Sequence, residues 1–360
     1  MADLAAALQA VKTGDYATAL KEFLPLAKQG NAVAQFNLGY MYAHGQGVPQ
    51  DYTEALRWYR KAAEQGEVNA QTFLGFIYSH GQGVLQDYAE AARWLRKAAE
   101  QGDLSSQFNL GTMYLHGQGV LQDYAEAIRW YRKSAEQGDG YAQFSLGDMY
   151  DLGQGVPQDY AEAARWLRKA AEQGVAHAQF NLGVMYYDGQ GIVQDYAEAA
   201  RWLRKAAEQR DVSSQFNLGN MYLHGQGVPQ DYAEAVRWFR KAAEQGLASA
   251  QSNLGAMYHE GQGVVQDYAE AIRWFREAAE QGDAAAQFNL GNMYHDGKGV
   301  PQDYVQAHMW VNLAASRSSG DDQKKYATAR DFLAGKMTAQ QIAEAQRLAR
   351  DWTPKIAKPH

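Results

Sequence analysis

The sequence feature that most constrains the fold is a unit that recurs every 36 residues with no insertion. The segment "AQFNLG" begins at Ala34 and returns in seven later versions. One glycine of each version keeps the step, at Gly39, Gly75, Gly111, Gly147, Gly183, Gly219, Gly255 and Gly291. A tryptophan row keeps the same step, from Trp58 to Trp310. A fixed period of this size is typical of repeat proteins, in which each unit packs only against its neighbours.

Each unit has the pattern of two helices. In the first copy, residues 32–44 bring Leu38 and Met41 onto one apolar face, and residues 51–65 repeat apolar side chains at helical spacing. Asp51 stands just before the second pattern, where its carboxylate can accept hydrogen bonds from free N–H groups of the helix. Neither helix buries its apolar face alone, so neighbouring copies must stack. The sequence therefore predicts an all-α fold, a right-handed superhelical solenoid of antiparallel helix pairs.

The two ends of the chain depart from the repeat, as caps do. Residues 1–30 keep the phase in a degenerate form and are expected to be an N-terminal cap. Residues 319–360 are expected to hold capping helices and a tail, with one helix near residues 322–334 and then a capping box at Thr338 and Gln341. Between the caps we expect eight repeats, at residues 31–66, 67–102, 103–138, 139–174, 175–210, 211–246, 247–282 and 283–318.

The unit "AQFNLGYMYAHGQGVPQDYTEALRWYRKAAEQG", residues 34–66, resembles the Sel-1-like repeat, a 36-residue relative of the tetratricopeptide repeat. The paired Leu-Gly, the GxGV loop, the D-Y-x-E-A run and the W-x-x-K/R-A-A-E-x-G tail carry the resemblance. It implies a bacterial source and an adaptor role. The adaptor could serve envelope assembly or signalling, or it could be a secreted factor that engages host proteins or an immunity protein. The sequence leaves these four alternatives open.

One position departs from the family pattern. Arg210 replaces the glycine that ends the second helix of the fifth copy. An arginine in the left-handed region costs about 1 kcal/mol. We therefore expect an altered turn at this position.

The loop "HGQGVPQDYAEA", residues 224–235, contains a glycine pair of the kind found in phosphate-binding loops. A dinucleotide site needs GxGxxG between a strand and a helix, and a P-loop ends in Gly-Lys-Ser/Thr. Here the pair follows a helix, and neither a third glycine nor a Lys-Ser/Thr step comes after it. We expect Gly225 to end the first helix in the left-handed conformation and Gly227 to let the chain reverse. No cofactor is expected.

The spacing of the histidines argues against a metal site. Equivalent helices in a stack lie about 10 Å apart, whereas a metal ligand lies about 2 Å from its ion. His259 with Glu260, and His295 with Asp296, are sequence neighbours that we expect to point in different directions along a helix. The chain has no cysteine. One row of histidines occupies a single position in different copies, at His44, His80, His116 and His224.

No residue combination typical of catalysis occurs in the sequence. SxxK, GxSxG and HExxH are all absent. Acidic and basic side chains such as Glu54 and Arg57 recur through the units at helical spacing, which is typical of a solvated face with i,i+3 and i,i+4 pairs. Some relatives are linked to cell-wall or β-lactam chemistry, but without SxxK no residue here can be assigned to it. We expect no enzyme activity, and a cell-wall enzyme is the weakest of three functional hypotheses.

Charge and hydropathy narrow the classes of partner. The net charge is −7 and the pI is about 5.7, so no nucleic-acid partner is expected. No run of 18 apolar residues occurs, so no membrane insertion is expected. Residues 1–20 lack the basic and apolar regions of a signal peptide. We expect a monomer that is cytoplasmic if the chain is complete, and periplasmic or secreted if a signal peptide was removed.

A binding surface is expected where the copies differ, because positions that stack must stay alike. The most variable positions of the first helix form an arc on the predicted concave face, and their residues change from apolar or mixed to polar along the chain. The candidate partner-binding residues are Tyr40, Phe76, Asp148, Asn220 and Asn292 in one row, and Leu115, Asp151, Tyr187, Leu223, His259 and His295 in the other.

An asparagine row lies within reach of that arc, at Asn37, Asn109, Asn181, Asn217, Asn253 and Asn289. In peptide-binding tetratricopeptide domains, which the unit resembles, an asparagine at the matching place holds the main chain of the peptide. An amide donates and accepts at once, as an extended backbone requires. The alternative is an inter-repeat hydrogen bond, and the two stay open here. Phe73 and Ser145 interrupt the row, and the phenylalanine row that starts at Phe36 is expected to wedge between copies.

The sequence thus favours a non-enzymatic scaffold that binds a peptide or protein partner on the concave surface of its first helices. The alternative is an immunity or inhibitor protein that masks a toxin or effector with a broad surface. No metal is expected in either case.

Overall fold

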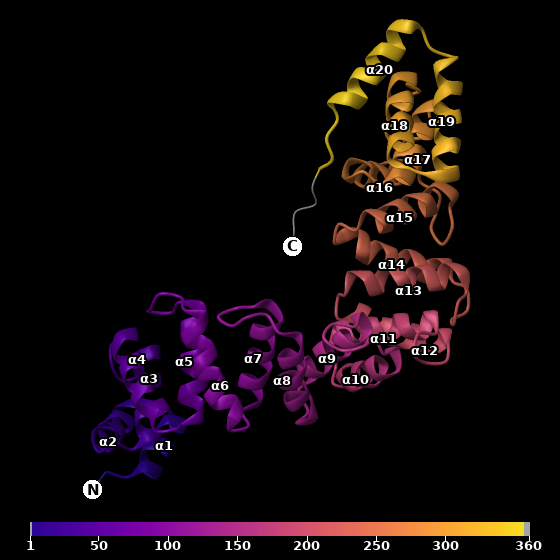
Figure 1. The fold of residues 1–360 in the computed structure, drawn as a ribbon. Coiled ribbons are helices and arrows are strands. Elements are labelled where there is room, and N and C mark those ends of the chain that lie inside the picture. The colour runs from indigo at the N-terminus through magenta and orange to yellow at the C-terminus, as the bar shows by residue number, and fades with distance from the viewer. Residues whose placement is uncertain (1, 356–360) are drawn as a thin grey trace. The chain divides into compact units, whose positions relative to one another are not determined.

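A computed structural model describes residues 2–355 of the 360-residue chain. Over this range the fold is all-α, with helices from α1 to α20 and no strand. The chain divides into two compact units, Met1–Val175 (unit 1) and Ala176–His360 (unit 2). Each unit is an α-solenoid of antiparallel helix pairs stacked side by side (Figure 1). We call the first helix of each pair helix A and the second helix B.

Unit 1 contains the N-terminal cap and the first four repeats. Each helix A packs against the helix B of its own pair, and each helix B packs against the helix A of the next pair. Odd numbers are helices A and even numbers are helices B. The helices are α1 (Leu4–Thr13), α2 (Tyr16–Lys28), α3 (Ala32–His44), α4 (Tyr52–Glu64), α5 (Val68–His80), α6 (Tyr88–Glu100), α7 (Leu104–His116), α8 (Tyr124–Glu136), α9 (Gly140–Leu152) and α10 (Tyr160–Glu172).

Unit 2 contains the last four repeats and the C-terminal cap. Two capping helices, α19 and α20, both pack against the last helix B, α18. The predicted capping box of α20 is present, because Thr338 and Gln341 exchange side-chain and backbone hydrogen bonds. The helices are α11 (Ala176–Asp188), α12 (Tyr196–Glu208), α13 (Val212–His224), α14 (Tyr232–Glu244), α15 (Ala248–Glu260), α16 (Tyr268–Gln281), α17 (Ala284–Asp296), α18 (Tyr304–Arg317), α19 (Gly320–Ala334) and α20 (Ala339–Asp351).

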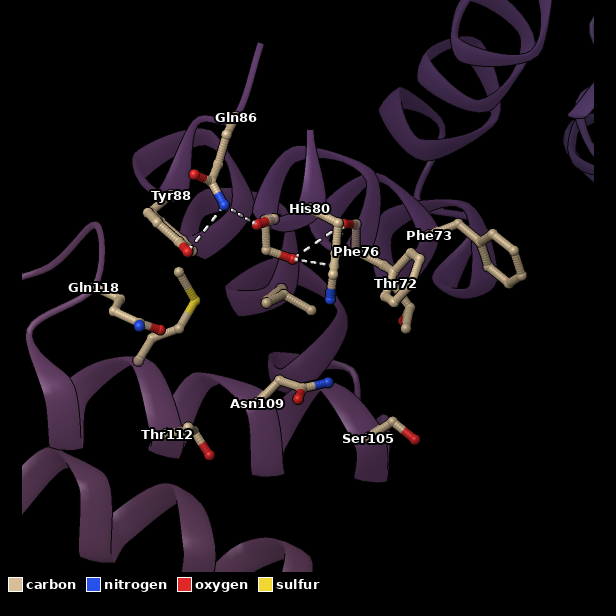
Figure 2. Close-up of a pocket in the computed structure, with 13 residues that line it drawn as sticks. Thr72, Phe73, Phe76, His80, Gln86, Tyr88, Ser105, Asn109, Thr112 and Gln118 are labelled. Atoms are coloured by element: carbon tan, nitrogen blue, oxygen red, sulfur yellow. Dashed lines mark hydrogen bonds between the residues drawn. The ribbon is translucent and has the colours of Figure 1, made fainter. Parts of the chain in front are cut away.

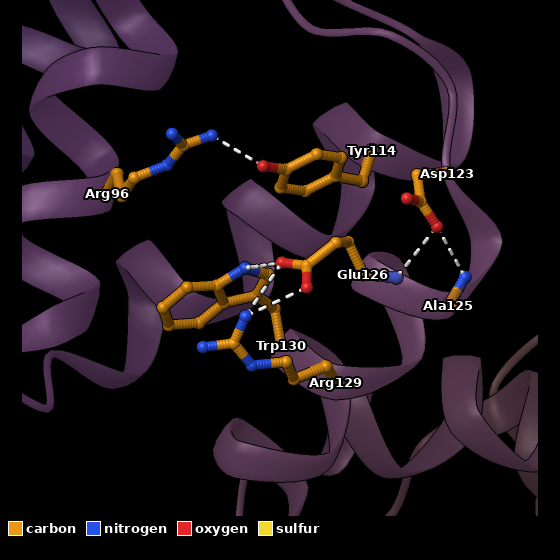
Figure 3. Close-up of polar contacts among 7 residues, drawn as sticks. All are labelled: Arg96, Tyr114, Asp123, Ala125, Glu126, Arg129 and Trp130. Carbon is orange, nitrogen blue, oxygen red and sulfur yellow. Dashed lines mark hydrogen bonds and ion pairs between the residues drawn. The ribbon is translucent and has the colours of Figure 1, made fainter.

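Local hydrogen bonds of one repeat show why helix B begins where it does (Figure 3). The Asp123 carboxylate accepts from the backbone N–H of Ala125 at 2.9 Å and of Glu126 at 3.1 Å, which satisfies two free donors of α8. The Glu126 carboxylate then pairs with Arg129 at 2.8 Å and accepts from Trp130 Nε1 at 3.2 Å. The predicted cap and the predicted i,i+3 ion pair are therefore both present.

The glycine pair of residues 224–235 has the structural role that its sequence context predicts. Gly225 ends α13 with φ of 68°, and its N–H donates to the carbonyl of Met221. Gly227 also has φ of 68°. A Cβ atom added at Gly227 would collide with the backbone of Tyr196, at the start of the preceding helix B. The second glycine is therefore required both by its φ and by close packing against the neighbouring copy.

The core of each repeat depends on close approach of helix A to helix B. Leu110 and Met113 on α7 and Tyr131 on α8 are buried. A Cβ atom at Gly111 would lie 2.8 Å from Cδ1 of Tyr131, so this glycine gives the tyrosine ring its space. The predicted wedge at Phe36 is also present, since its ring lies 5.5 Å from that of Phe73 in the next copy.

A ladder of buried glutamines links the copies, and the sequence reasoning missed it. Gln107 on α7 is buried; its Nε2 donates to the carbonyl of Ala99 in the preceding copy at 3.1 Å. Its Oε1 accepts from Gln137 Nε2, at the end of its own helix B, at 2.7 Å. The signal was a glutamine that never varies at a position flanked by core residues. The donating glutamine of the row recurs at Gln35, Gln71, Gln143, Gln215, Gln251 and Gln287.

A second link between copies joins helix B to the next helix A. Arg96 Nη2 on α6 donates to the hydroxyl of Tyr114 on α7 at 2.5 Å (Figure 3). The sequence predicts that the basic residues only form a solvated face with local ion pairs. That prediction is incomplete, because this arginine row holds neighbouring repeats together. The same bond joins Arg60 to Tyr78, Arg132 to Tyr150, Arg204 to Tyr222, Arg240 to Tyr258 and Arg276 to Tyr294.

The prediction of an altered turn at Arg210 is wrong. Arg210 adopts φ of 71°, in the region that glycine occupies in the other copies. Its N–H donates to the carbonyl of Ala207 at 3.1 Å, as Gly246 donates to Ala243 at 2.9 Å. The repeat therefore keeps its turn geometry and takes the strain of a left-handed arginine.

Candidate partner-binding site on the helix-A face

The predicted partner-binding residues lie on the helices A of both units, and every one of them keeps some solvent exposure. Some helices A of successive copies also contact one another directly. Within unit 1, α5 contacts α7 across the intervening helix B, and within unit 2, α15 contacts α17. In a curved stack the layer with the closer spacing is the inner one, so the helix-A face is the inner side at both places.

A pocket of about 660 Å³ lies on this face between α5 and α7 of unit 1 (Figure 2). Figure 2 shows Thr72, Phe76 and His80 on one wall, with Ser105, Asn109 and Thr112 on the facing helix. Its lining includes the apolar side chains of Phe73, Phe76, Leu95 and Met113. The structure thus brings together two predicted site residues, Phe76 and Asn109, from neighbouring copies.

The α5 wall of the pocket is held in shape by its own hydrogen bonds. The ring of His80 packs on that of Phe76 with 4.1 Å between centroids, and His80 Nδ1 lies 2.9 Å from the carbonyl oxygen of Phe76. Ser79 Oγ donates to the carbonyl of Gly75 at 2.8 Å. The side chain of Phe76 is 48% exposed. The wall therefore presents a fixed aromatic surface to solvent.

The α7 wall supplies polar groups. Thr112 Oγ1 lies 3.0 Å from the hydroxyl of Tyr131, so this threonine is committed to the fold. Asn109 is exposed, and within residues 2–355 its amide has no side-chain hydrogen bond. An amide in this state has both its donor and its acceptor available for a ligand.

Two aspartates follow on α9, the next helix A of unit 1. Asp148 occupies the row of Phe76 and Thr112, and Asp151 lies one turn along the same face. Burial raises the pKa of Asp148, and the charge of Asp151 raises it further. Burial also raises the pKa of Asp151. Across residues 2–355 neither carboxylate has a cationic partner.

Among the helices A of the repeats, large exposed apolar side chains occur in unit 1 alone, within the part of the chain that the structure describes. Besides Phe76 they include Tyr141, which is 66% exposed, and Leu152, which is 55% exposed, both on α9. Val33 on α3 is a fourth. In unit 2 the exposed Phe332 belongs to the capping helix α19. The helix-A face of unit 1 is therefore apolar and acidic.

Unit 2 has a smaller and more polar pocket on the same face, of about 340 Å³ between α15 and α17. It brings together three predicted site residues, His259, Asn289 and Asn292. Its other polar residues are Glu260, Asp296 and Lys298.

The expectation that His295 and Asp296 point apart is wrong. His295 Nδ1 lies 2.8 Å from Asp296 Oδ1, because the pair sits at the end of α17 where the side chains can turn toward each other. Lys336 Nζ approaches the other ring nitrogen at 3.4 Å. The described residues contain no cluster of three or more groups able to hold a metal ion.

The asparagine row has more than one role. Asn253 Nδ2 donates to Asn220 Oδ1 of the preceding copy at 3.4 Å, which is the inter-repeat bond of the structural alternative. Asn37 Nδ2 donates instead to the carbonyl of Val33 on its own helix at 2.8 Å. Asn109 and Asn289 line the two pockets. Asn181 and Asn217 are partly exposed on α11 and α13.

Several other predicted site residues contribute to the fold as well as to the surface. Tyr40 stacks on His44 with 3.9 Å between centroids. The Tyr187 hydroxyl donates to Gln226 Oε1 at 2.9 Å. Leu115 and Leu223 pack, half-buried, against core clusters. These residues are therefore weaker candidates for direct partner contact than Phe76 and Asn109.

A family comparison agrees with the repeat geometry. The sequence model of the Sel1 repeat matches eight consecutive segments, at residues 32–67, 68–103, 104–139, 140–175, 176–211, 212–247, 248–283 and 284–319. The chain belongs to the Sel1 repeat family. Sel1 repeat proteins are generally protein-interaction scaffolds, and their fold is generally non-enzymatic.

Two solved Sel1 repeat structures are similar to this one. A Sel1 repeat protein from Oxalobacter formigenes is 37% identical, over 86% of this chain and 90% of its own, with a TM-score of 0.66. A protective antigen present in uropathogenic Escherichia coli strains is 35% identical, over 94% of this chain and 87% of its own, with a TM-score of 0.54. A search of curated proteins gives no match. None of the described helices is long and apolar enough to span a lipid bilayer.

Proposed function

We propose that this Sel1 repeat protein is a scaffold that binds an extended segment of a partner protein along its helix-A face. The observation that carries the proposal is the pocket between α5 and α7, where exposed Phe76 faces the unpaired amide of Asn109. Phe76 stands at a position that varies among the copies. Asn109 stands in the row that matches the peptide-holding asparagines of tetratricopeptide domains. An apolar surface beside a free amide suits a peptide, which offers side chains and a backbone at once.

The fold favours this use because the face is formed before the partner arrives. Glutamine and arginine bonds link successive repeats within each unit, so the helix-A face needs little ordering on binding. A preformed face lowers the entropic cost of association. An extended segment can then contact several copies in succession.

A peptide-display selection tests the proposal. Wild-type protein is used to select from a random linear dodecapeptide library, and the affinity of the enriched peptides is measured by fluorescence anisotropy. Phe76→Asp is expected to lower that affinity at least tenfold, since it places a charge where an apolar side chain docks. Leu121→Asp is the matched control, because Leu121 is 91% exposed on a loop of the same unit.

The proposal fails if no peptide is enriched, or if Phe76→Asp and Leu121→Asp bind equally well. Circular dichroism of both variants confirms that the helices are retained. A broad-surface inhibitor of a folded toxin, the alternative function, predicts that no linear peptide is enriched.

A further inference from the structure

The helix-A face of unit 1 holds two neighbouring carboxylates that have no cationic partner among the described residues. On the helix-B side of the same unit, the glutamate in the first turn of a helix is paired with an arginine one turn away, as Glu90 is with Arg93 at 2.6 Å and Glu162 with Arg165 at 2.5 Å. Asp148 and Asp151 have no such arginine among the described residues, although burial raises the pKa of both. A cation that reaches them from outside therefore gains a favourable interaction that the fold leaves unmade.

The two carboxylates lie one repeat step from the apolar pocket. Phe76 on α5 and Thr112 on α7 line the pocket, and Asp148 occupies the same row on α9. Neighbouring helices A in a stack are about 10 Å apart, and an extended chain advances about 3.3 Å per residue. One repeat step thus corresponds to about three residues of a bound segment.

We propose that the segment bound by unit 1 carries a large apolar side chain, which enters the pocket between α5 and α7, and a lysine or arginine about three residues away, which lies against Asp148 and Asp151 on α9. Charge complementarity selects the cation, and the exposed ring of Phe76 in the pocket selects the apolar side chain. This inference rests on the proposed function and adds the chemistry of the segment. Arginine is well suited, because its fork of donors can reach two carboxylates at once.

The restriction to unit 1 follows from the contrast with unit 2. At the rows of Asp148 and Asp151, α15 and α17 carry Ala256, His259, Asn292 and His295, and none of their exposed side chains is large and apolar within the described residues. The pocket there contains Glu260 and Lys298, and Lys298 is already paired with Asp296 at 3.2 Å. Within the described residues, the helices A of the repeats therefore combine a large exposed apolar side chain with two neighbouring carboxylates that lack a cationic partner in unit 1.

The test uses the same dodecapeptide library, now with charge variants of the full chain. Wild-type protein is expected to enrich peptides that pair an aromatic or large aliphatic residue with lysine or arginine at a spacing of about three residues. Asp148→Asn with Asp151→Asn is expected to weaken such a peptide at least tenfold, since one charge-assisted bond corresponds to about tenfold or more in affinity. Glu100→Gln with Glu136→Gln, two exposed helix-B positions of unit 1, removes the same charge and is the matched control.

The charge-reversed variant Asp148→Lys with Asp151→Lys gives an independent readout. It is expected to enrich peptides with aspartate or glutamate in place of the basic residue, while the apolar residue is kept. The inference is overturned, and the proposed function kept, if Phe76-dependent peptides are enriched without a basic residue, or if the aspartate and control variants bind alike. Failure to enrich any Phe76-dependent peptide overturns both.

Discussion

The glutamine ladder gives the sharpest prediction about what holds the repeats together, and Gln107→Leu is the perturbation. Leucine has nearly the volume of glutamine, so the change removes the polar groups and leaves little cavity. The carbonyl of Ala99 loses the side-chain donor that lies 3.1 Å away, but it keeps the backbone N–H of Gly102, also at 3.1 Å. Gln137 loses its acceptor but is itself exposed, so its amide turns to water.

The expected destabilisation comes from the lost hydrogen bond between the two copies. The Ala99 carbonyl keeps its backbone donor, and the solvated Gln137 amide turns to water, so neither group is left unsatisfied. A net hydrogen bond contributes about 1 kcal/mol, so we expect the α6–α7 junction to lose about 1 kcal/mol of stability. Because repeat stability is a sum of local and nearest-neighbour terms, the loss should be concentrated in the adjoining repeats.

Hydrogen exchange read by mass spectrometry measures this locally. A loss of about 1.4 kcal/mol appears as a tenfold fall in protection, so a loss of about 1 kcal/mol should make amides of α6 and α7 exchange about fivefold faster. Gln82→Leu is the control, since Gln82 is exposed and its side chain makes no hydrogen bond within the described range. Equal protection in the two variants, to within about 0.5 kcal/mol, would show that the ladder does not hold the copies together.

Three further predictions concern stability. Arg210→Gly should raise the stability of its turn by up to about 1 kcal/mol, once the greater conformational freedom of glycine in the unfolded chain is subtracted. Gly246→Arg, at φ of 91°, should lower the stability of the equivalent turn. If urea unfolding gives stability changes of the same sign for both variants, the arginine is not strained. Asp123→Ala should destabilise α8 by about 0.5–2 kcal/mol through loss of its cap, seen as faster exchange of that helix, and an unchanged exchange rate argues against the cap. Burial lowers the pKa of His308, and the charge of Arg330 lowers it further. The neutral imidazole therefore stabilises the fold above pH 6.5, and this contribution declines as the pH falls through 6.5 toward the lower pKa of the folded state. His308→Val should flatten this decline in thermal melts, and an unchanged pH profile would contradict the prediction.

The sequence predicts most of the fold because one period carries the information for every copy. The expected bounds 32–44 agree with α3, and the caps at Asp51 and Gly225 are where turn chemistry places them. The prediction at Arg210 is wrong because local propensity does not decide this turn. The repeats stacked on its two sides hold the turn in place. Tertiary context can impose about 1 kcal/mol of strain on one residue when its neighbours fix the geometry.

The candidate site is less visible in the sequence, because a helical arc does not say which amides are already used. Asn37, Asn109 and Asn253 share one row, yet the first bonds to its own helix, the last bonds to the neighbouring copy, and Asn109 alone of the three faces a pocket. Side-chain geometry decides among these outcomes, and spacing does not. The change from apolar to polar residues along the rows was visible, and it is the same contrast that separates the faces of units 1 and 2.

Site-specific photo-cross-linking tests the central claim most directly. A photoreactive benzoyl-phenylalanine placed at Ser105, on the α7 wall of the pocket, is compared with the same residue at Arg129, which is exposed on α8. With a peptide selected by the wild-type protein, binding along the helix-A face predicts a cross-link from position 105 and none from position 129. A cross-link from position 129 alone would contradict the account.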